Sequence, residues 1–259
     1  MTPTISDIVK ILEELVPPEL AEDWDNVGLM IGRKNHPVKK IMFALDFTKE
    51  VLEQAIKQNA DLIITHHPAI FKKLAAIRDD EWQSNLLLAA AEHGIAVYSA
   101  HTNLDCVGTG VNHVLARRFM LEDVDVLDES NGLGRIGTTQ TTSLEDFAAF
   151  VKKRLKANYV VVGDAGRKVH RVAVCGGAGS DLIDLALAKG ADTLVTGDVK
   201  YHSAQRAVFS GLNILDAGHQ STELPVLDQF ADRLSAYLVN AEYDVMVTIA
   251  RETLLLRQI

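Results

Sequence analysis

Asp61-Leu62-Ile63-Ile64-Thr65-His66-His67-Pro68 is a short apolar run that ends in two adjacent histidines and a proline. The run from Leu62 to Thr65 has the length and β-branched content of a buried strand. Pro68 lacks a backbone donor and disfavours helical geometry at His67, so the chain must leave the strand there. Ligands of open α/β sheets bind at the carboxyl ends of strands, so both imidazoles could face one cleft. The alternative is a polar strand end with one structural histidine, since strict strand alternation would point the two rings apart.

The composition of the 259-residue chain, 47% hydrophobic and 24% charged, is typical of a globular protein. A net charge of -9 argues against a broad surface for nucleic acid or acidic membrane. Cys106 and Cys175 have no zinc or redox spacing, which favours a reduced, cytoplasmic location. We see no signal-peptide pattern at the N-terminus, and no apolar run approaches the roughly 20 residues of a membrane span.

Strands and helices alternate along the chain, which predicts an α/β fold. The clearest strands are expected at residues 41–45, 62–65, 95–98, 169–175 and 212–215, with helices between them. Trp24 lies in a loop, residues 22–29, and is expected to anchor that loop on the core. The acids of this loop could face the site, although a structural loop is the simpler interpretation. Residues 121–134 are acidic and glycine-rich without a clear period. We therefore expect a first lobe at residues 1–124, a connection at 125–134 and a second lobe at 135–259.

The second half of the chain repeats the pattern of the first. Ala60-Asp61-Leu62-Ile63-Ile64-Thr65 is echoed by Ala191-Asp192-Thr193-Leu194-Val195-Thr196, and a strand and a helix precede each copy. The next strand ends toward His101 and Asp105 in the first half and toward His219 and Glu223 in the second. Chance similarity of two βαβ units is the alternative to duplication. We predict two similar α/β lobes related by internal pseudo-symmetry, with mixed or parallel sheets flanked by helices.

Polar side chains that can bind metal follow the matched strand ends. If the lobes face each other, five of them could share one cleft: His66, His67, Asp105, His219 and Glu223. Imidazoles and carboxylates suit divalent Zn, Mn, Fe, Co or Ni. Five ligands exceed the three that are typical of one catalytic zinc, so two divalent ions per chain use them better.

Further candidates lie near these ligands. His101 could be another ligand, a proton shuttle or, most simply, a side chain that orients a ligand. Asp46 could orient a histidine or merely precede a helix, and Asp198 and His202 are candidates for acid/base work or solvated helix-start residues. The turn at residues 175–180 could present N–H groups to a phosphate, or it is a tight structural turn.

Several motifs together resemble the NIF-three-like family, whose members are also called GTP cyclohydrolase 1 type 2 homologues. They are Trp24-Asp25-Asn26-Val27-Gly28-Leu29, Thr65-His66-His67-Pro68, His101-Thr102-Asn103-Leu104-Asp105, Cys175-Gly176-Gly177-Ala178-Gly179 and Gly218-His219-Gln220-Ser221-Thr222-Glu223. The resemblance implies a dinuclear metal site on the five ligands above, two similar α/β lobes and a toroidal homohexamer. It also implies that the chain lacks the middle insertion domain of longer members.

These features support two classes of function. The first is a metal-dependent hydrolase that opens a purine ring, as the homologue name suggests, or cleaves a phosphoester, with His202, Asp198 and His101 as candidate acid/base groups. Its substrate would be a small molecule, such as a nucleotide. The second is a non-enzymatic metal-binding or regulatory hexamer, or a scaffold in which the metals are structural.

Overall fold

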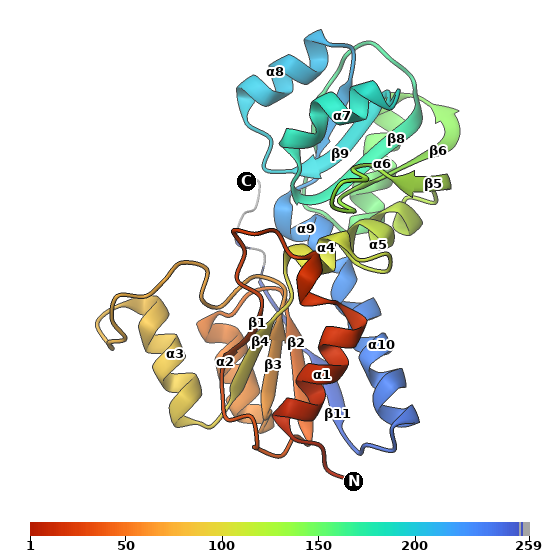
Figure 1. The fold of residues 1–259 in the computed structure, drawn as a ribbon. Coiled ribbons are helices and arrows are strands. Elements are labelled where there is room, and N and C mark those ends of the chain that lie inside the picture. Colours follow the sequence, from red (N-terminus) through yellow and green to blue (C-terminus); the bar gives the residue numbers. More distant parts are fainter. Residues whose placement is uncertain (254, 256–259) are drawn as a thin grey trace. The chain divides into compact units, whose positions relative to one another are not determined.

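The computed structural model describes residues 1–253 and residue 255. These residues form two compact units (Figure 1). Unit 1 consists of Met1–Leu104 and Leu227–Thr253, and unit 2 contains Asp105–Val226. Each unit has a mixed sheet flanked by helices, which confirms the predicted α/β class. The connection expected at residues 125–134 lies inside unit 2.

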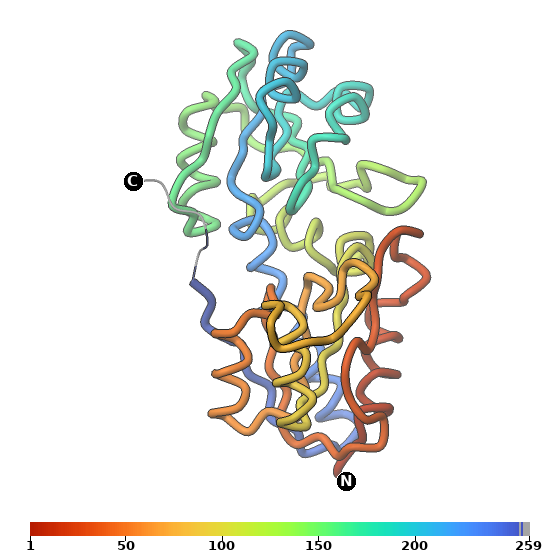
Figure 2. The backbone as a smooth tube through the Cα atoms, turned by 90° about the vertical axis from the view of Figure 1, so that its left-hand side faces the viewer, coloured from red at the N-terminus to blue at the C-terminus, as the bar shows by residue number. Residues whose placement is uncertain are grey.

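The sheet of unit 1 has its strands in the order β1-β4-β3-β2-β11. The strands are β1 (Gly28–Ile31), β2 (Lys40–Ala44), β3 (Leu62–Thr65), β4 (Ala96–Ser99) and β11 (Met246–Ile249). All neighbours are parallel except β1, which pairs antiparallel with β4 at the edge. Strand β11 comes from the end of the chain and lies beside β2 (Figure 2). The carboxyl ends of β2, β3, β4 and β11 therefore share one edge of the sheet.

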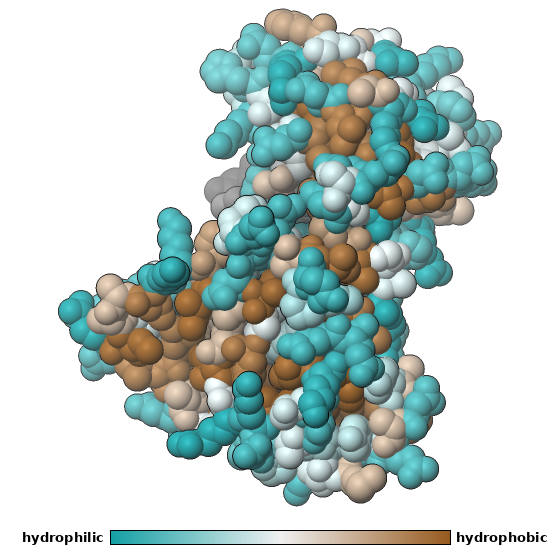
Figure 3. Space-filling model, viewed as in Figure 1, coloured by the Kyte–Doolittle hydropathy of each residue, from teal (hydrophilic) through white to brown (hydrophobic). Residues whose placement is uncertain are grey.

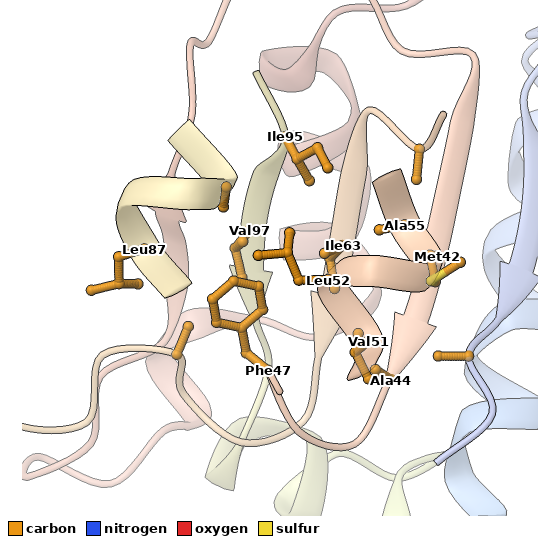
Figure 4. Close-up of a cluster of buried hydrophobic side chains, with 14 residues drawn as sticks. Met42, Ala44, Phe47, Val51, Leu52, Ala55, Ile63, Leu87, Ile95 and Val97 are labelled. Carbon is orange, nitrogen blue, oxygen red and sulfur yellow. The ribbon is translucent and has the colours of Figure 1, made fainter. Parts of the chain in front are cut away.

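Helices cover both faces of this sheet. They are α1 (Ile5–Leu15), α2 (Lys49–Gln58), α3 (Trp82–Glu92) and most of α10 (Pro225–Asn240), with a 3₁₀ turn at Pro18–Leu20. On one face Met42, Ile63 and Val97 pack with Leu52 of α2 and Leu87 of α3 (Figure 4). On the other face Phe43 contacts Phe230 of α10, with ring centroids 5.2 Å apart. Alternate strand residues thus serve opposite cores, as expected for a strand buried on both sides.

Unit 2 has six strands in the order β5-β6-β8-β9-β10-β7. They are β5 (Glu122–Val126), β6 (Arg135–Thr142), β7 (Val161–Gly163), β8 (Val169–Ala178), β9 (Thr193–Gly197) and β10 (Asn213–Asp216). Strands β8, β9 and β10 are parallel, and β5, β6 and β7 run antiparallel to their neighbours. The helices are α5 (Val111–Arg118), α6 (Leu144–Leu155), α7 (Ile183–Ala188), α8 (Tyr201–Phe209) and α9 (His219–Glu223), with a 3₁₀ turn at Ser180–Leu182. Helix α4 (Thr102–Cys106) spans the division between the units.

Four neighbouring strands repeat in order and direction between the two sheets: β1-β4-β3-β2 in unit 1 and β7-β10-β9-β8 in unit 2. In unit 1, Ile41 of β2 is opposite Leu62 of β3, which is opposite Ala96 of β4. In unit 2 the corresponding row is Val172, Thr193 and Asn213. The repeat in the sequence therefore corresponds to a repeat in strand pairing.

The repeated aspartate has the same role in both sheets. Asp61 Oδ2 accepts hydrogen bonds from the backbone N–H groups of Lys39 and Lys40, at 2.7 and 2.9 Å. Asp192 Oδ2 accepts from the two corresponding N–H groups beside the start of β8, at 2.9 and 2.6 Å. Each carboxylate accepts hydrogen bonds from two backbone N–H groups near the start of the neighbouring strand. This satisfies N–H groups at the edge of the sheet and is a structural reason for both copies of the motif.

The edge strand β5 of unit 2 was not predicted from the sequence. Residues 121–134 show no clear period in the sequence and no strand was predicted there, but Glu122–Val126 form the edge strand β5. Residues 122–125 are exposed, so β5 has no buried face and shows no apolar alternation. Acidic side chains are a usual feature of edge strands, because they discourage pairing with other chains.

The surface of unit 1 includes hydrophobic side chains around α3 (Figure 3). Phe71, Ile77 and Trp82, in and before α3, are all exposed. Among the described residues, none of the helices combines the length and hydrophobicity that a membrane crossing requires.

Candidate metal centre

Three histidines come together at the carboxyl edge of the unit 1 sheet. His66 and His67 directly follow β3, and their N–H groups continue the parallel pairing by donating to Ala44 O and Leu45 O. One residue, Ala100, separates His101 from the end of β4. Ring centroids of His66 and His67 are 5.0 Å apart, so the two rings do not point to opposite faces. Strand β3 ends at Thr65, and strand alternation therefore no longer applies to them.

The three imidazoles form a compact group, which we call the histidine cluster. The centroid of the His101 ring is 5.2 Å from that of His66 and 5.6 Å from that of His67. One ring nitrogen from each residue lies within 4.8 Å of the other two. Such spacing is compatible with a shared metal ion, because Zn–N bonds are about 2.0–2.1 Å long.

Each ring of the histidine cluster is held through its Nδ1 atom. His66 Nδ1 is 2.9 Å from Ala100 O, His67 Nδ1 is 2.8 Å from Asp46 Oδ1, and His101 Nδ1 is 2.9 Å from an oxygen of Asp25. A carbonyl oxygen can only accept, so Nδ1 of His66 carries the proton and Nε2 has the lone pair in the neutral ring. Metal-binding histidines typically have this partner on the second nitrogen. The restraint thus presents Nε2 as the ligand atom.

Asp25 is the most constrained of these partners. Its side chain is fully buried and accepts hydrogen bonds from His101 and from the N–H and hydroxyl of Thr102. Burial acts to raise the pKa of Asp25, but the hydrogen bonds from His101 and Thr102 outweigh it and hold the pKa well below its usual range. Asp25 is therefore ionised at neutral pH and fixes the orientation of His101.

Unit 2 contributes one further histidine, His219, whose Nδ1 is also held by an oxygen. His219 opens α9, and its Nδ1 is 2.8 Å from Asp198 Oδ2. Its Nε2 is 3.2 Å from Glu223 Oε1, one helical turn further on. An i, i+4 pair lies on one helix face, so α9 presents one imidazole and one carboxylate side by side.

Glycine at position 177 makes room for this pair. Gly177 has φ +61°, and a Cβ there would collide with the Glu223 carboxylate and lie 3.2 Å from His219 Nε2. Burial, followed by the negative charges of Asp105 and Glu223, raises the pKa of the Cys175 thiol. The charges of Asp105 and Glu223 therefore both reach the buried Cys175 thiol of β8, and α9 places the imidazole of His219 beside the Glu223 carboxylate.

The glycine-rich turn uses its N–H groups internally. Gly176 N donates to Asn112 Oδ1, Gly177 N to Thr222 Oγ1 and Gly179 N to Thr196 Oγ1, at 2.8–3.0 Å. Strand β8 continues to Ala178, so most of the turn is strand. These bonds favour the structural interpretation of residues 175–180 over phosphate binding.

The candidate acid/base residues occupy different surroundings. His101 belongs to the histidine cluster, and Asp198 holds Nδ1 of His219. His202 is exposed in the first turn of α8, with its ring 5.3 Å from that of Tyr201. The catalytic roles of all three stay predictions.

Glu252 is a neighbour of the histidine cluster that the sequence did not suggest. Its carboxylate accepts from the N–H groups of Leu45, at 2.6 Å, and Asp46, at 3.0 Å. Burial raises its pKa, while those hydrogen bonds and His67 act in the opposite direction. It reaches this position because β11 runs parallel to β2. Leu45 and Glu252 are 207 residues apart in the sequence, so no local pattern reveals their contact.

Comparison with known proteins gives matches over almost the whole chain. Residues 3–253 match the family described as Duf34/NIF3 (NGG1p interacting factor 3). A "GTP cyclohydrolase 1 type 2 homolog" of Clostridium perfringens is 34% identical over 255 residues, 96% of each chain. The solved structure of the Staphylococcus aureus hypothetical protein SA1388 is 28% identical, covers 100% of both chains and has a TM-score of 0.93. A Bacillus cereus protein related to NIF3 is 26% identical over 98% of each chain, with a TM-score of 0.92.

Proposed function

The chain belongs to the Duf34/NIF3 family, as its motifs indicated, and from the chemistry of its histidines and carboxylates we propose that it is a metal-dependent hydrolase. The observation that carries the proposal is the histidine cluster, in which every ring has Nδ1 held by an oxygen. Structural histidines need no such common arrangement, whereas metal ligands usually have it.

We propose that two divalent ions are bound per chain by His66, His67, Asp105, His219 and Glu223. This set of imidazoles and carboxylates fits Zn, Mn, Fe, Co or Ni and is less suited to a purely oxygen-bound ion such as Mg. A bound divalent metal supplies Lewis acidity and makes water a stronger acid. Asp46 and Asp198 orient His67 and His219, and thereby hold those rings in one tautomer.

His101 is our candidate for proton transfer. It lies in the histidine cluster, and the ionised Asp25 holds its Nδ1. An imidazole oriented by a buried carboxylate is a common general acid/base, since the carboxylate stabilises the protonated ring. The same geometry allows His101 to be a further metal ligand. A His101→Gln variant separates the two roles: full metal loading with lost turnover indicates proton transfer, whereas reduced metal loading indicates a ligand.

The substrate we propose is a nucleotide or another phosphoester. The name of the Clostridium perfringens relative, a GTP cyclohydrolase 1 type 2 homolog, points to a nucleotide. Hydrolysis would open the purine ring or cleave the phosphoester bond.

A substrate screen tests the proposal. Metal-loaded protein is incubated with GTP, other nucleotides and p-nitrophenyl phosphate, and products are separated by chromatography. We expect turnover of at least one of these that chelator and Glu223→Ala both abolish. If metal-loaded wild type never exceeds the Glu223→Ala background, the hydrolase proposal fails for these substrates, and a metal-binding regulatory protein replaces it.

We also propose that the protein is a homohexamer, as the family resemblance implies. Multi-angle light scattering in moderate salt measures the mass directly. A single species near six times the 28.3 kDa of one chain is expected, and a dominant monomer at micromolar concentration would contradict it.

A further inference from the structure

Two exposed aromatic side chains lie against the histidine cluster. Trp24 is 60% exposed and Phe71 is 47% exposed, although Trp24 was expected from the sequence to anchor its loop on the core. The centroids of these two rings are 6.0 Å apart. The centroid of the His101 ring lies 6.1 Å from that of Trp24 and 6.2 Å from that of Phe71. A continuous set of rings thus runs from the histidine cluster to the surface of unit 1.

The exposure of Trp24 does not come from a loosely held loop. Asp25, next to Trp24, accepts two hydrogen bonds from Thr102, at 3.0 and 2.6 Å. Asn26 Nδ2 donates to the backbone oxygen of Ile70, at 2.5 Å, and so ties the loop to the residue before Phe71. Hydrogen bonds therefore hold the chain directly after Trp24 and directly before Phe71.

Their geometry suits a planar partner. The ring planes are inclined by 62° for Trp24 and Phe71, 76° for Trp24 and His101, and 82° for Phe71 and His101, so none of these pairs is stacked. Ring faces that are exposed and fixed are the usual platform on which nucleobases stack. An exposed indole also leaves apolar surface in water, which a flat ligand would cover.

The chain next to Phe71 adds positive charge. Lys72 and Lys73 follow it directly, and both are exposed. Lysine is a common partner of phosphate groups, as a compact and flexible point charge. An aromatic platform followed by two lysines matches a ligand that combines a flat ring with a phosphate.

We propose that Trp24 and Phe71 form a stacking site for the base of a nucleotide, with Lys72 and Lys73 beside its phosphate. The inference rests on the proposed function, because it narrows the proposed substrate to a nucleotide and assigns the residues beside its base and phosphate. It places the base beside the histidine cluster, within reach of His101.

The chain offers a matched pair of fluorescence reporters. It has two tryptophans, and the second, Trp82, is 72% exposed at the start of α3. Trp82→Phe leaves Trp24 as the single indole, and Trp24→Phe leaves Trp82. We expect GMP to quench the Trp82→Phe protein saturably and to leave the Trp24→Phe protein unquenched after inner-filter correction. Ribose 5-phosphate, which lacks the base, should quench neither.

Calorimetry supplies the second measurement. Trp24→Ala should weaken GMP binding by roughly 5–150-fold, the effect of losing one stacked base, while Trp82→Ala should leave it unchanged. Equal quenching of Trp24 by ribose 5-phosphate and GMP, or unchanged GMP affinity in Trp24→Ala, would overturn the stacking site. So would Trp24 emission that changes with protein concentration alone, since a second copy of the chain would then cover the rings.

Metal content, measured on the same samples, separates this inference from the proposed function. Bound metal without base-dependent quenching refutes the stacking site alone. Base-dependent quenching in protein that cannot be loaded with metal refutes the hydrolase proposal and leaves the stacking site standing.

Discussion

Replacing His219 with alanine is expected to lower the affinity for divalent metal by more than about 100-fold and to remove metal-dependent hydrolysis with it. Loss of a residue that merely orients a ligand typically costs 10–100-fold, so loss of the ligand itself should cost more. The fold should persist, because the side chain is 34% exposed and alanine is a good helix former. Competition with a metal-binding dye measures the affinity, and circular dichroism checks the fold.

His170 provides the matched control. It is an exposed histidine of the same unit whose Nδ1 is likewise 2.7 Å from a backbone oxygen, that of Thr139. The structure puts no carboxylate of the metal-ligand set beside it among the described residues. His170→Ala should therefore bind metal like wild type. Equal losses in both variants, or none in His219→Ala, would remove His219 from the ligand set.

The second large effect is expected at Asp198. Replacing its carboxylate with the neutral amide of asparagine should lower metal affinity by about 10–100-fold, because His219 Nδ1 loses its charged partner. Asparagine is the right replacement because Asp198 has φ +51°, a left-handed conformation that asparagine tolerates better than alanine. Titration of Zn or Mn into the apo variant measures the change.

Asp123 is the control for this substitution. It is also an aspartate with positive φ, +49°, but it lies exposed in β5. Asp123→Asn should leave metal affinity as in wild type. If Asp198→Asn binds metal normally and instead loses turnover at full loading, Asp198 is the acid/base group suggested by the sequence, and its role as an orienting residue is wrong.

The strand ends could be predicted from the sequence because their cause is local. A β-branched run that meets His66, His67 and Pro68 must end there, and the run repeats around Asp192 with the same register. The pairing of the parallel strands within each sheet follows from that repeat. The partners of the imidazoles could be predicted only in part. Asp46 was a candidate because it follows the first strand of the sheet, whereas Asp25 lies in a loop whose acids could face the site but which was more simply interpreted as structural.

Other features depend on contacts between distant parts of the chain. Glu252 approaches His67 because β11 joins the sheet beside β2, and nothing in the last residues of the sequence signals this. Trp24 was expected inside because tryptophan is mostly buried, but its loop is fixed through Asp25 and Asn26 instead. The edge strand β5 was missed because it has no buried face to produce an alternating pattern.

The proposed dinuclear site is tested most simply by the metal content of the protein itself. Protein purified without chelator, or reloaded with Zn or Mn and freed of unbound ions, is measured by elemental analysis against an independently determined chain concentration. We expect two divalent ions per chain in wild type and in His170→Ala, and fewer in a Glu223→Ala variant. Fewer than one ion per chain in wild type after reloading would contradict the proposed site.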